Sequence, residues 1–349
     1  HRFEESTDGT ALREENPEVF HYLDEIGFFK QERPPAPLQI DPFEPPEHAV
    51  ILMTNRCHLR CIYCYADGGV GPAQTIRRET AARVIDQACE NTRQNGKKSF
   101  KISFHGGGEP TYPWSLFKDL VRHARSKPLA ANISVTSNGI WSPAQCRFML
   151  KYMDGISISM DGMPSTQDTN RPFSGGKGSF AVIGRNLKMM EENNFSYTIR
   201  MTTCQPFSSL PDDVAYICEH TQCRMIQVEP AFIPQRGHHS QSTQKGAEMF
   251  VEAFLRAYDV AHKHRCRLSY PGGHVGGRPN STFCSAPYRA LIATPAGNLV
   301  TCYEVTDEQH PLFPISHVGR VEADTVTVDQ GALGALHRMM EERRETCRD

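Results

Sequence analysis

Three cysteines stand within eight residues, in the segment Cys57-His58-Leu59-Arg60-Cys61-Ile62-Tyr63-Cys64. Their thiolates can bind three irons of a cube-shaped iron–sulfur cluster, and because no fourth cysteine stands nearby, one iron would stay open to a ligand. Two alternatives are cysteines buried as small apolar side chains and a structural zinc site. Zinc would need a fourth cysteine or histidine, and His58 directly follows one ligand, so the spacing favours the cluster.

The composition is that of an ordinary globular protein. The chain has 349 residues, of which 39% are hydrophobic and 22% charged, enough for one barrel-sized domain with an appendage. It contains no run of about 20 apolar residues that could span a bilayer. The net charge of −2 and the lack of a basic stripe argue against a nucleic-acid partner. We expect neither membrane insertion nor nucleic-acid binding.

The chain has twelve cysteines, and we expect no signal peptide. In such a chain, cysteines are typically metal ligands and reduced thiols rather than disulfides. This usage predicts a cytoplasm under anaerobic or other reducing conditions. We also expect the protein to be bacterial.

Residues 1–47 read as an acidic, proline-rich arm with one amphipathic segment over 17–29. From residue 49 onward, short apolar runs alternate with amphipathic helices. Strands are predicted at 49–53, 100–104, 132–136, 155–159, 197–202 and 225–229. A helix is predicted after each of them, the first at 75–95 and the last at 243–264. Six such units indicate an α/β fold, a partial (β/α)6 TIM-like barrel over residues 48–265.

The alternation of strands and helices ends after residue 265. A β-hairpin is predicted over 290–302 and a helix over 331–345. We therefore assign residues 266–349 to a second, C-terminal domain that is rich in cysteines.

Polar residues follow each predicted strand. In a parallel α/β barrel, functional groups gather at the carboxyl ends of the strands. Glycines let a ligand approach the backbone, Glu109 can hold an amine, and an arginine fork suits a carboxylate. The residues at these ends are Gly107, Gly108 and Glu109, then Ser137 and Asn138, then Ser159, Asp161 and Arg171, then Arg200, then Gln227 and Glu229. Together they predict a pocket for methionine joined to adenosine, beside the open iron.

The motifs Cys57-x3-Cys61-x-Tyr63-Cys64 and Gly107-Gly108-Glu109-Pro110 resemble those of the radical S-adenosylmethionine (radical SAM) enzymes. The resemblance implies a [4Fe-4S] cluster with an open iron and bound S-adenosylmethionine, which is cleaved to a 5′-deoxyadenosyl radical. It further implies how the ligand is held. Residues 107–109 would bind the methionyl amine, Ser137 and Asn138 the ribose region, and Arg171 or Arg200 the carboxylate. Tyr63 would pack near the adenine, and residues 58–60 would be spacers. Ser159 is also expected among the residues that bind the ligand.

The segment Cys284-x12-Gly297-x4-Cys302 resembles the opening of the SPASM domain of peptide-modifying radical SAM enzymes. The resemblance implies Cys284 and Cys302 as ligands of an auxiliary [4Fe-4S] cluster, with Cys347 beginning the next cysteine group. One or two auxiliary clusters are possible, because the rest of that group would follow Asp349. A shorter, one-cluster twitch domain is the alternative.

The residue after Cys302 bears on the substrate. Sulfatase-maturing members of the family have an aspartate there, whereas this chain has Tyr303 and then Glu304. We therefore expect a maturase of ribosomally made precursor peptides that forms a C–C, C–O or thioether cross-link. Sulfatase maturation and small-molecule dehydrogenation are the alternatives. Expected partners are a flavodoxin or ferredoxin as electron donor and a separate leader-binding protein; candidates for proton transfer are Asp161, Glu229, Tyr303 and Glu304.

Overall fold

The structure is a computed structural model that describes residues 44–232, 234–237, 242–272, 284–322 and 325–345, together with Pro17 and His21. The amphipathic segment 17–29 and Cys347 lie outside the described residues, apart from those two positions. From residue 44 onward, the described residues belong to one compact unit. Among the helices that are described, none is long and apolar enough to cross a membrane.

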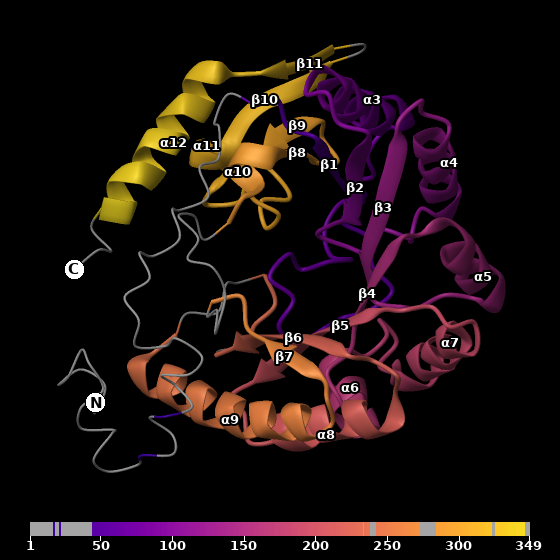
Figure 1. Cartoon of the computed structure of the whole chain (residues 1–349), viewed down its shortest axis with the longest axis vertical. Coiled ribbons are helices and arrows are strands. Elements are labelled where there is room, and N and C mark those ends of the chain that lie inside the picture. Colours follow the sequence, from indigo (N-terminus) through magenta and orange to yellow (C-terminus); the bar gives the residue numbers. More distant parts are fainter. Residues whose placement is uncertain are drawn as a thin grey trace. The chain divides into compact units, whose positions relative to one another are not determined.

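Seven parallel strands form the body of the sheet, and they pair in chain order. They are β1 (His48–Leu52), β2 (Ser99–His105), β3 (Ala130–Ser137), β4 (Gly155–Ser159), β5 (Thr198–Cys204), β6 (Met225–Ala231) and β7 (Arg267–Ser269). The connecting helices are α3 (Arg78–Gln94), α4 (Trp114–Arg125), α5 (Pro143–Tyr152), α6 (Pro164–Asn170), α7 (Phe180–Glu192), α8 (Leu210–His220) and α9 (Gln244–Lys263). Figure 1 shows the strands arranged along a curve, with the connecting helices on its outer side. The predicted partial barrel of the α/β class is confirmed, since the sheet does not close; β7 and α6 were not predicted.

Local sequence explains these elements. Helix α5 begins with a capping box, in which the Ser142 side chain accepts from the Gln145 N–H and the Gln145 side chain accepts from the Ser142 N–H. Helix α4 buries residues at i, i+3, i+4 and i+7, namely Phe117, Leu120, Val121 and Ala124. These apolar stripes hold the helices against the outer face of the sheet.

The two faces of the sheet differ in polarity. In β2, Phe100, Ile102 and Phe104 are fully buried and face the helices. The alternate residues, which include Ser103 and His105, point to the inner face and remain partly exposed. The inside of a TIM barrel is normally filled by bulky branched side chains. Here the inner face of β2 is polar and open instead.

The C-terminal part of the chain continues the same sheet. Strand β8 (Ala290–Ala293) pairs in parallel with β1, on the side opposite β2, and β9 (Asn298–Val300) forms the predicted hairpin with it. Two further strands, β10 (His317–Glu322) and β11 (Thr325–Val328), were not predicted and extend the sheet to eleven strands. The short helices α10 (Ala286–Arg289) and α11 (Phe313–Ser316) precede the predicted final helix, α12 (Gln330–Glu345). The assignment of residues 266–349 to a separate domain stays a prediction.

Candidate functional site

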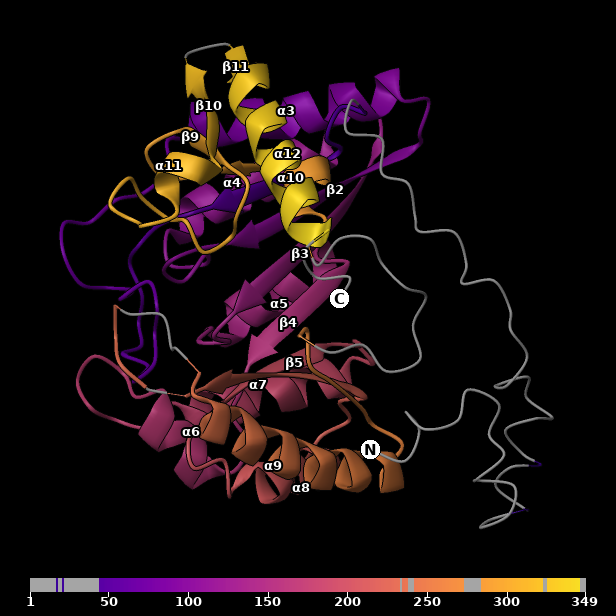
Figure 2. The same ribbon diagram turned by 90° about the vertical axis from the view of Figure 1, so that its left-hand side faces the viewer.

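The three motif cysteines lie in the loop that connects β1 to α3. The base of this loop is closed by backbone hydrogen bonds, among them Ile76 N–H to the Met53 carbonyl at 3.0 Å. Its cysteine segment is fastened to the end of α6, since Ile62 N–H donates to the Asn170 carbonyl at 2.9 Å and Arg60 N–H to that of Pro172 at 2.8 Å. In Figure 2 this indigo loop lies on the side to which β3 and β4 point. The cysteines therefore stand at the carboxyl ends of the strands, as expected for a barrel site.

The Arg60 side chain holds the loop from within. Its guanidinium donates to the carbonyls of Cys57 at 3.1 Å, Leu59 at 3.0 Å and Gly69 at 2.7 Å. Arg60 thus does more than fill the interval between two cysteines. It ties the first half of the cysteine segment to Gly69, which follows that segment.

A second guanidinium holds the loop from outside. Arg236, which follows β6, donates to the carbonyls of Cys61 at 2.7 Å and Gly68 at 3.1 Å and pairs with Asp67 at 2.8 Å. The next residue, Gly237, donates its N–H to the Cys64 carbonyl at 2.9 Å. The segment after β6 therefore positions two of the three motif cysteines.

The sulfur atoms receive hydrogen bonds from nearby N–H groups. Leu59 N–H and the Asn138 side-chain amide donate to Cys57 Sγ at 3.5 and 3.6 Å, and Gly68 N–H donates to Cys64 Sγ at 3.4 Å. Such donors are typical of thiolates that bind iron–sulfur clusters. All three cysteines are unpaired by disulfides and partly exposed. This donor set fits a cluster held by three cysteines.

The surroundings of Cys57 and Cys61 favour the uncharged thiol. Burial, followed by the Glu109 carboxylate, raises the pKa of Cys57 to about 12, and burial raises that of Cys61 to about 11. Without positive metal charge both thiols would stay protonated at neutral pH. Within the described residues, no three His, Cys, Asp or Glu side chains converge on a point as the ligands of one metal ion. A cluster, which is larger than an ion, spreads its thiolates further apart.

The glycines after β2 allow two loops to touch. A Cβ on Gly108 would lie 2.2 Å from the Arg56 carbonyl oxygen, and a Cβ on Gly107 would lie 2.8 Å from the Thr306 methyl. Gly108 N–H donates to the Thr54 carbonyl at 2.9 Å. Gly108 therefore packs against the cysteine loop and Gly107 against Thr306 of the C-terminal part. Their predicted contact with a methionyl amine stays a prediction.

Glu109 connects the ends of β2 and β3. It is 2% exposed, and its Oε1 accepts from Thr111 N–H at 3.0 Å, Thr111 Oγ1 at 2.6 Å and Ser137 Oγ at 2.7 Å. Oε2 accepts only from Asn138 N–H, at 2.8 Å, within the described residues. A carboxylate oxygen has two lone pairs, so Oε2 retains one for a further donor. The structure thus brings together Glu109, Ser137 and Asn138 of the predicted site.

Asp161, Tyr63 and Arg171 form a buried network. Asp161 Oδ1 accepts from Arg171 Nε at 3.0 Å and from Thr202 N–H at 2.9 Å, and Oδ2 accepts from the Tyr63 hydroxyl. The Arg171 guanidinium lies 5.2 Å from the centre of the Tyr63 ring. Burial raises the pKa of Tyr63 well above its usual value. Asp161 is 1% exposed and already accepts several hydrogen bonds, which suits a structural role better than proton transfer.

Arg200 and Glu229 face the inside of the barrel on neighbouring strands. Their side chains approach to 3.9 Å and are each more than one third exposed. Burial raises the pKa of Glu229, while the Gln227 amide and the Arg200 charge act in the opposite sense. Ser159 of β4 is in register with Arg200 of β5. This loosely paired Arg200 is more accessible to a ligand than Arg171, whose side chain is 10% exposed.

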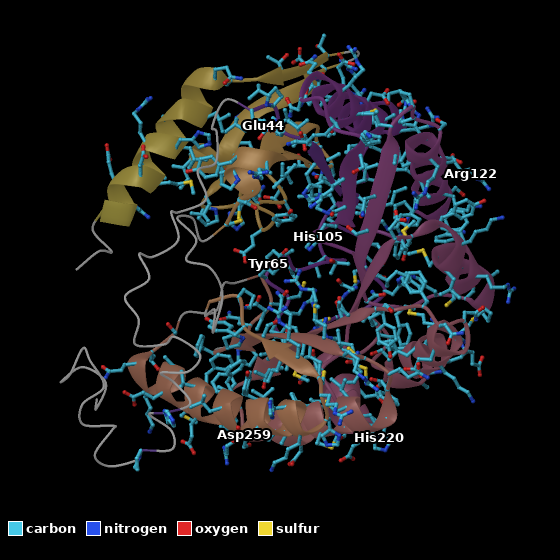
Figure 3. All side chains as sticks on the ribbon, viewed as in Figure 1. Glu44, Tyr65, His105, Arg122, His220 and Asp259 are labelled. Atoms are coloured by element: carbon cyan, nitrogen blue, oxygen red, sulfur yellow. The ribbon has the colours of Figure 1, made fainter. Side chains whose placement is uncertain are left out.

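The C-terminal part contributes a third group of side chains. The ring of Tyr303 contacts that of His105 edge-on at 5.4 Å between centres. Burial, followed by the charge of Glu304, raises the pKa of Tyr65, which also feels Cys64 and Cys302. Figure 3 shows Tyr65 and His105 near the centre of the ring of strands, far from the outer residues Arg122 and Asp259. Tyr303 and Glu304 therefore belong to the same interior as the cysteine loop.

Cys284 and Cys302 are brought close to one another by the turn before α10 and the end of the hairpin. Burial raises the pKa of Cys302, and the neighbouring Glu304 and Cys284 add to this effect. Ala286 N–H donates to Cys284 Sγ at 3.5 Å. Cys284 is exposed and Cys302 partly so. A shared ligand of these two thiols stays a prediction, and Cys347 lies outside the described residues.

Several residues of the site escaped the sequence analysis. No sequence motif marks Thr111, Arg236 or Tyr65. Arg60 was predicted to be a spacer because it lies between the expected cluster ligands Cys57 and Cys61. Arg236 contacts a carbonyl that lies 175 positions earlier in the chain. Such a contact depends on the folded barrel, so no local pattern announces it.

Comparison with curated proteins gives partial matches. Over 278 residues the chain is 29% identical to the sporulation killing factor maturation protein SkfB of Bacillus subtilis, covering 78% of this chain and 62% of SkfB. Over 155 residues it is 30% identical to the Fe-coproporphyrin III synthase of Methanosarcina barkeri, covering 43% of this chain and 35% of the synthase. The chain therefore spans less than two thirds of the length of these relatives.

Solved structures share the fold. Native anSMEcpe with bound AdoMet superposes with a TM-score of 0.62 at 16% identity, covering 84% of this chain and 83% of that chain. Streptococcus suis SuiB bound to S-adenosylmethionine gives a TM-score of 0.58 at 14% identity, covering 85% of this chain and 66% of that chain. Residues 51–207 match the Radical SAM superfamily. The match thus identifies a radical SAM domain over these residues, which include the cysteine loop and the strands from β2 to β5.

Proposed function

We propose that the protein is a radical SAM enzyme that abstracts a hydrogen atom from a ribosomally made precursor peptide and closes a cross-link in it. The observation that carries the proposal is the cysteine loop itself, whose sulfurs accept hydrogen bonds and which packs against Gly108 and Asn138 from the two neighbouring strand ends. The similarity to SkfB, which is named as the maturation protein of a sporulation killing factor, and the fold shared with structures solved with bound peptides support a peptide as the substrate.

Cys57, Cys61 and Cys64 would hold a [4Fe-4S] cluster, and Glu109 would accept the methionyl ammonium on the remaining lone pair of Oε2. When bound together, the cluster and S-adenosylmethionine supply the 5′-deoxyadenosyl radical. The Asn138 amide would hold the Cys57 sulfur, and Arg200 would bind the methionyl carboxylate. Arg171 is the weaker candidate for that carboxylate, because its guanidinium is already engaged with Asp161.

Cross-linking removes two hydrogen atoms from the peptide. One leaves with the deoxyadenosyl group, and the other leaves as a proton and an electron. Glu229, Tyr303 and Glu304 line the interior and are the proposed proton acceptors, ahead of the buried Asp161. Cys284 and Cys302 would hold an auxiliary cluster that accepts the electron, and the bond formed would be C–C, C–O or thioether.

The test is anaerobic co-expression with any small open reading frame that lies beside the gene, followed by mass spectrometry of the peptide. We expect a product lighter by two hydrogens, with fragmentation that places the cross-link. The matched control carries Cys57→Ala, Cys61→Ala and Cys64→Ala and should form no deoxyadenosine and no product. Deoxyadenosine formation in that triple variant would contradict the proposal.

Other outcomes separate the alternatives. An unchanged mass with an inverted Cα centre would indicate epimerisation rather than cross-linking. Deoxyadenosine formed with an unmodified peptide would favour a small-molecule dehydrogenase, and conversion of a sulfatase cysteine or serine to formylglycine would favour sulfatase maturation. Reduction by flavodoxin or ferredoxin, and a requirement for a separate leader-binding protein, are tested by adding each to the purified enzyme.

A further inference from the structure

The polar inner face of the sheet continues from the radical site to the opposite ends of the strands. On β2, His105, Ser103 and Lys101 alternate with the buried apolar residues and share this face. Ser103 Oγ forms hydrogen bonds of 2.8 Å with both His48 Nε2 and Ser134 Oγ. These bonds join β2 to its neighbours β1 and β3 on this face. A peptide that reaches the cysteine loop can therefore lie along a hydrophilic surface rather than a packed core.

A cavity of about 160 Å³ opens at the amino ends of β1 and β2. Its lining includes Lys101 from the inner face of β2, His48 from β1, and Tyr288 and Arg289 from α10. These residues come from the barrel and from the C-terminal part of the chain. The cavity thus lies at the end of the hydrophilic surface that is remote from the cysteine loop.

The charges in this cavity are unbalanced. Lys97 pairs with both Glu44 and Glu47 at 2.6 Å. By contrast, Lys101 and Arg289 form no ion pair with any carboxylate in the part of the chain that the structure describes. Burial, followed by the Lys101 charge, lowers the pKa of His48 to about 4, so this histidine is neutral at pH 7. Glu44 and Glu47 also line the cavity and share the single charge of Lys97, so the five charged side chains of the lining carry a net charge of +1, which leaves one positive charge for a further anion.

We propose that Lys101 and Arg289 bind a carboxylate of the peptide substrate while its reacting residue lies at the other end of β2. Lys101 and His105 are four residues apart, or about 13 Å along the strand. An extended peptide spans the same distance with the same number of residues. The bound carboxylate therefore belongs to the C-terminus, or to an Asp or Glu side chain, about four residues from the modified position. This inference rests on the proposed function.

Carbodiimide cross-linking of the anaerobic holoenzyme with the synthetic precursor peptide tests the contact directly. The reagent joins a carboxylate to a lysine that touches it, so we expect an amide between Lys101 and the peptide. The internal amide between Lys97 and Glu44 or Glu47 is the positive control, since that contact needs no peptide. Formation of the internal amide without any Lys101 adduct would overturn the inference.

Kinetics supply the second arm. The double variant Lys101→Gln with Arg289→Gln should raise KM for the peptide about tenfold, because a charge-assisted contact is lost, and leave peptide-independent deoxyadenosine formation unchanged. The matched control, Lys118→Gln with Arg147→Gln, removes the same charge from α4 and α5 on the outer face and should behave as wild type. An unchanged KM in the first variant would overturn the inference.

Peptide variants distinguish the two sources of the carboxylate. If the C-terminus is bound, amidation should raise KM for the wild type by the same factor and add nothing in the double variant. If a side chain is bound, an Asp→Asn or Glu→Gln change in the peptide at that position should raise KM for the wild type and leave KM for the double variant unchanged. A carbodiimide adduct at Lys101 with a peptide that the enzyme does not modify would refute the proposed function alone. A peptide that the enzyme modifies, with neither a Lys101 adduct nor a change in KM, would refute this inference alone.

Discussion

The side-chain amide of Asn138 donates a hydrogen bond to the sulfur of Cys57 across 3.6 Å, and so joins the end of β3 to the cysteine loop. The backbone N–H of Asn138 is itself fixed, because it donates to Glu109 Oε2 at 2.8 Å. The amide is therefore held in place from the β2 side of the site. A donor at this position stabilises negative charge on the sulfur.

Replacing Asn138 by leucine should lower the reduction potential of the bound cluster, since the reduced state gains negative charge and loses a donor. A net hydrogen bond of about 1 kcal/mol corresponds to roughly 40 mV for a one-electron couple. Potentiometric titration followed by electron paramagnetic resonance measures the shift. Asn193→Leu, at the end of α7, is the control, and an equal potential in both variants would show that the Asn138 contact is without effect.

Arg236→Gln should loosen the cysteine loop, because the shorter side chain cannot reach Asp67 and the carbonyls of Cys61 and Gly68 together. We expect iron to be lost to a chelator several-fold faster than from the wild type. The release is followed by absorbance under anaerobic conditions. Arg224→Gln is the matched control, because Arg224 donates only to the neighbouring Cys223 carbonyl among the contacts described. Equal release from the two variants would argue against a positioning role for Arg236.

Gly108→Ala should displace the cysteine loop, since the added Cβ would lie 2.2 Å from the Arg56 carbonyl oxygen and 2.6 Å from the Asn55 carbonyl carbon. Both are backbone atoms and cannot move aside cheaply. We expect a loss of stability of about 1–3 kcal/mol and reduced cluster content, measured by urea unfolding and iron analysis. Gly175→Ala has open space around the new Cβ and serves as the control. Full iron content and stability in Gly108→Ala would contradict the packing described.

The fold should lose stability on acidification, partly through His48. Its pKa is about 4 in the folded state, lowered by burial and Lys101, against about 6.5 when unfolded. Between these values the unfolded chain binds more protons, so stability is complete above pH 6.5 and falls as the pH drops toward 4. At pH 5 the contribution is about 2 kcal/mol. Comparing anaerobic urea unfolding at pH 7 and pH 5, His48→Gln should show a smaller difference than the wild type.

Much of the fold could be predicted because its signals are local. The strand predicted at 155–159 is observed at Gly155–Ser159, and the capping box at Ser142 forms as expected. Strands β10 and β11 could not be predicted in this way, since their pairing with β9 and with each other follows from the sheet that precedes them.

The site was predictable in its residue types and less so in their partners. Glu109, Ser137 and Asn138 meet at two strand ends, as expected for a barrel. However, Thr111 and Ser137 already donate three hydrogen bonds to the Glu109 carboxylate. Asp161 and Arg171 also meet, but they neutralise one another at 2.9 Å in the interior. Sequence identifies which side chains reach a strand end, whereas only the folded packing decides which of them remain available to a ligand.

Strand β1 has consequences for how this protein can be divided. Its alternate residues Val50 and Leu52 are fully buried in a small core that β8 and β9 complete through Ile292 and Val300. A fragment ending after α9 would present β1 as a bare apolar edge, which invites strand-to-strand aggregation. The C-terminal part is therefore not an interchangeable module. Chimeras that exchange it between relatives will have to carry the facing residues of β1 with it.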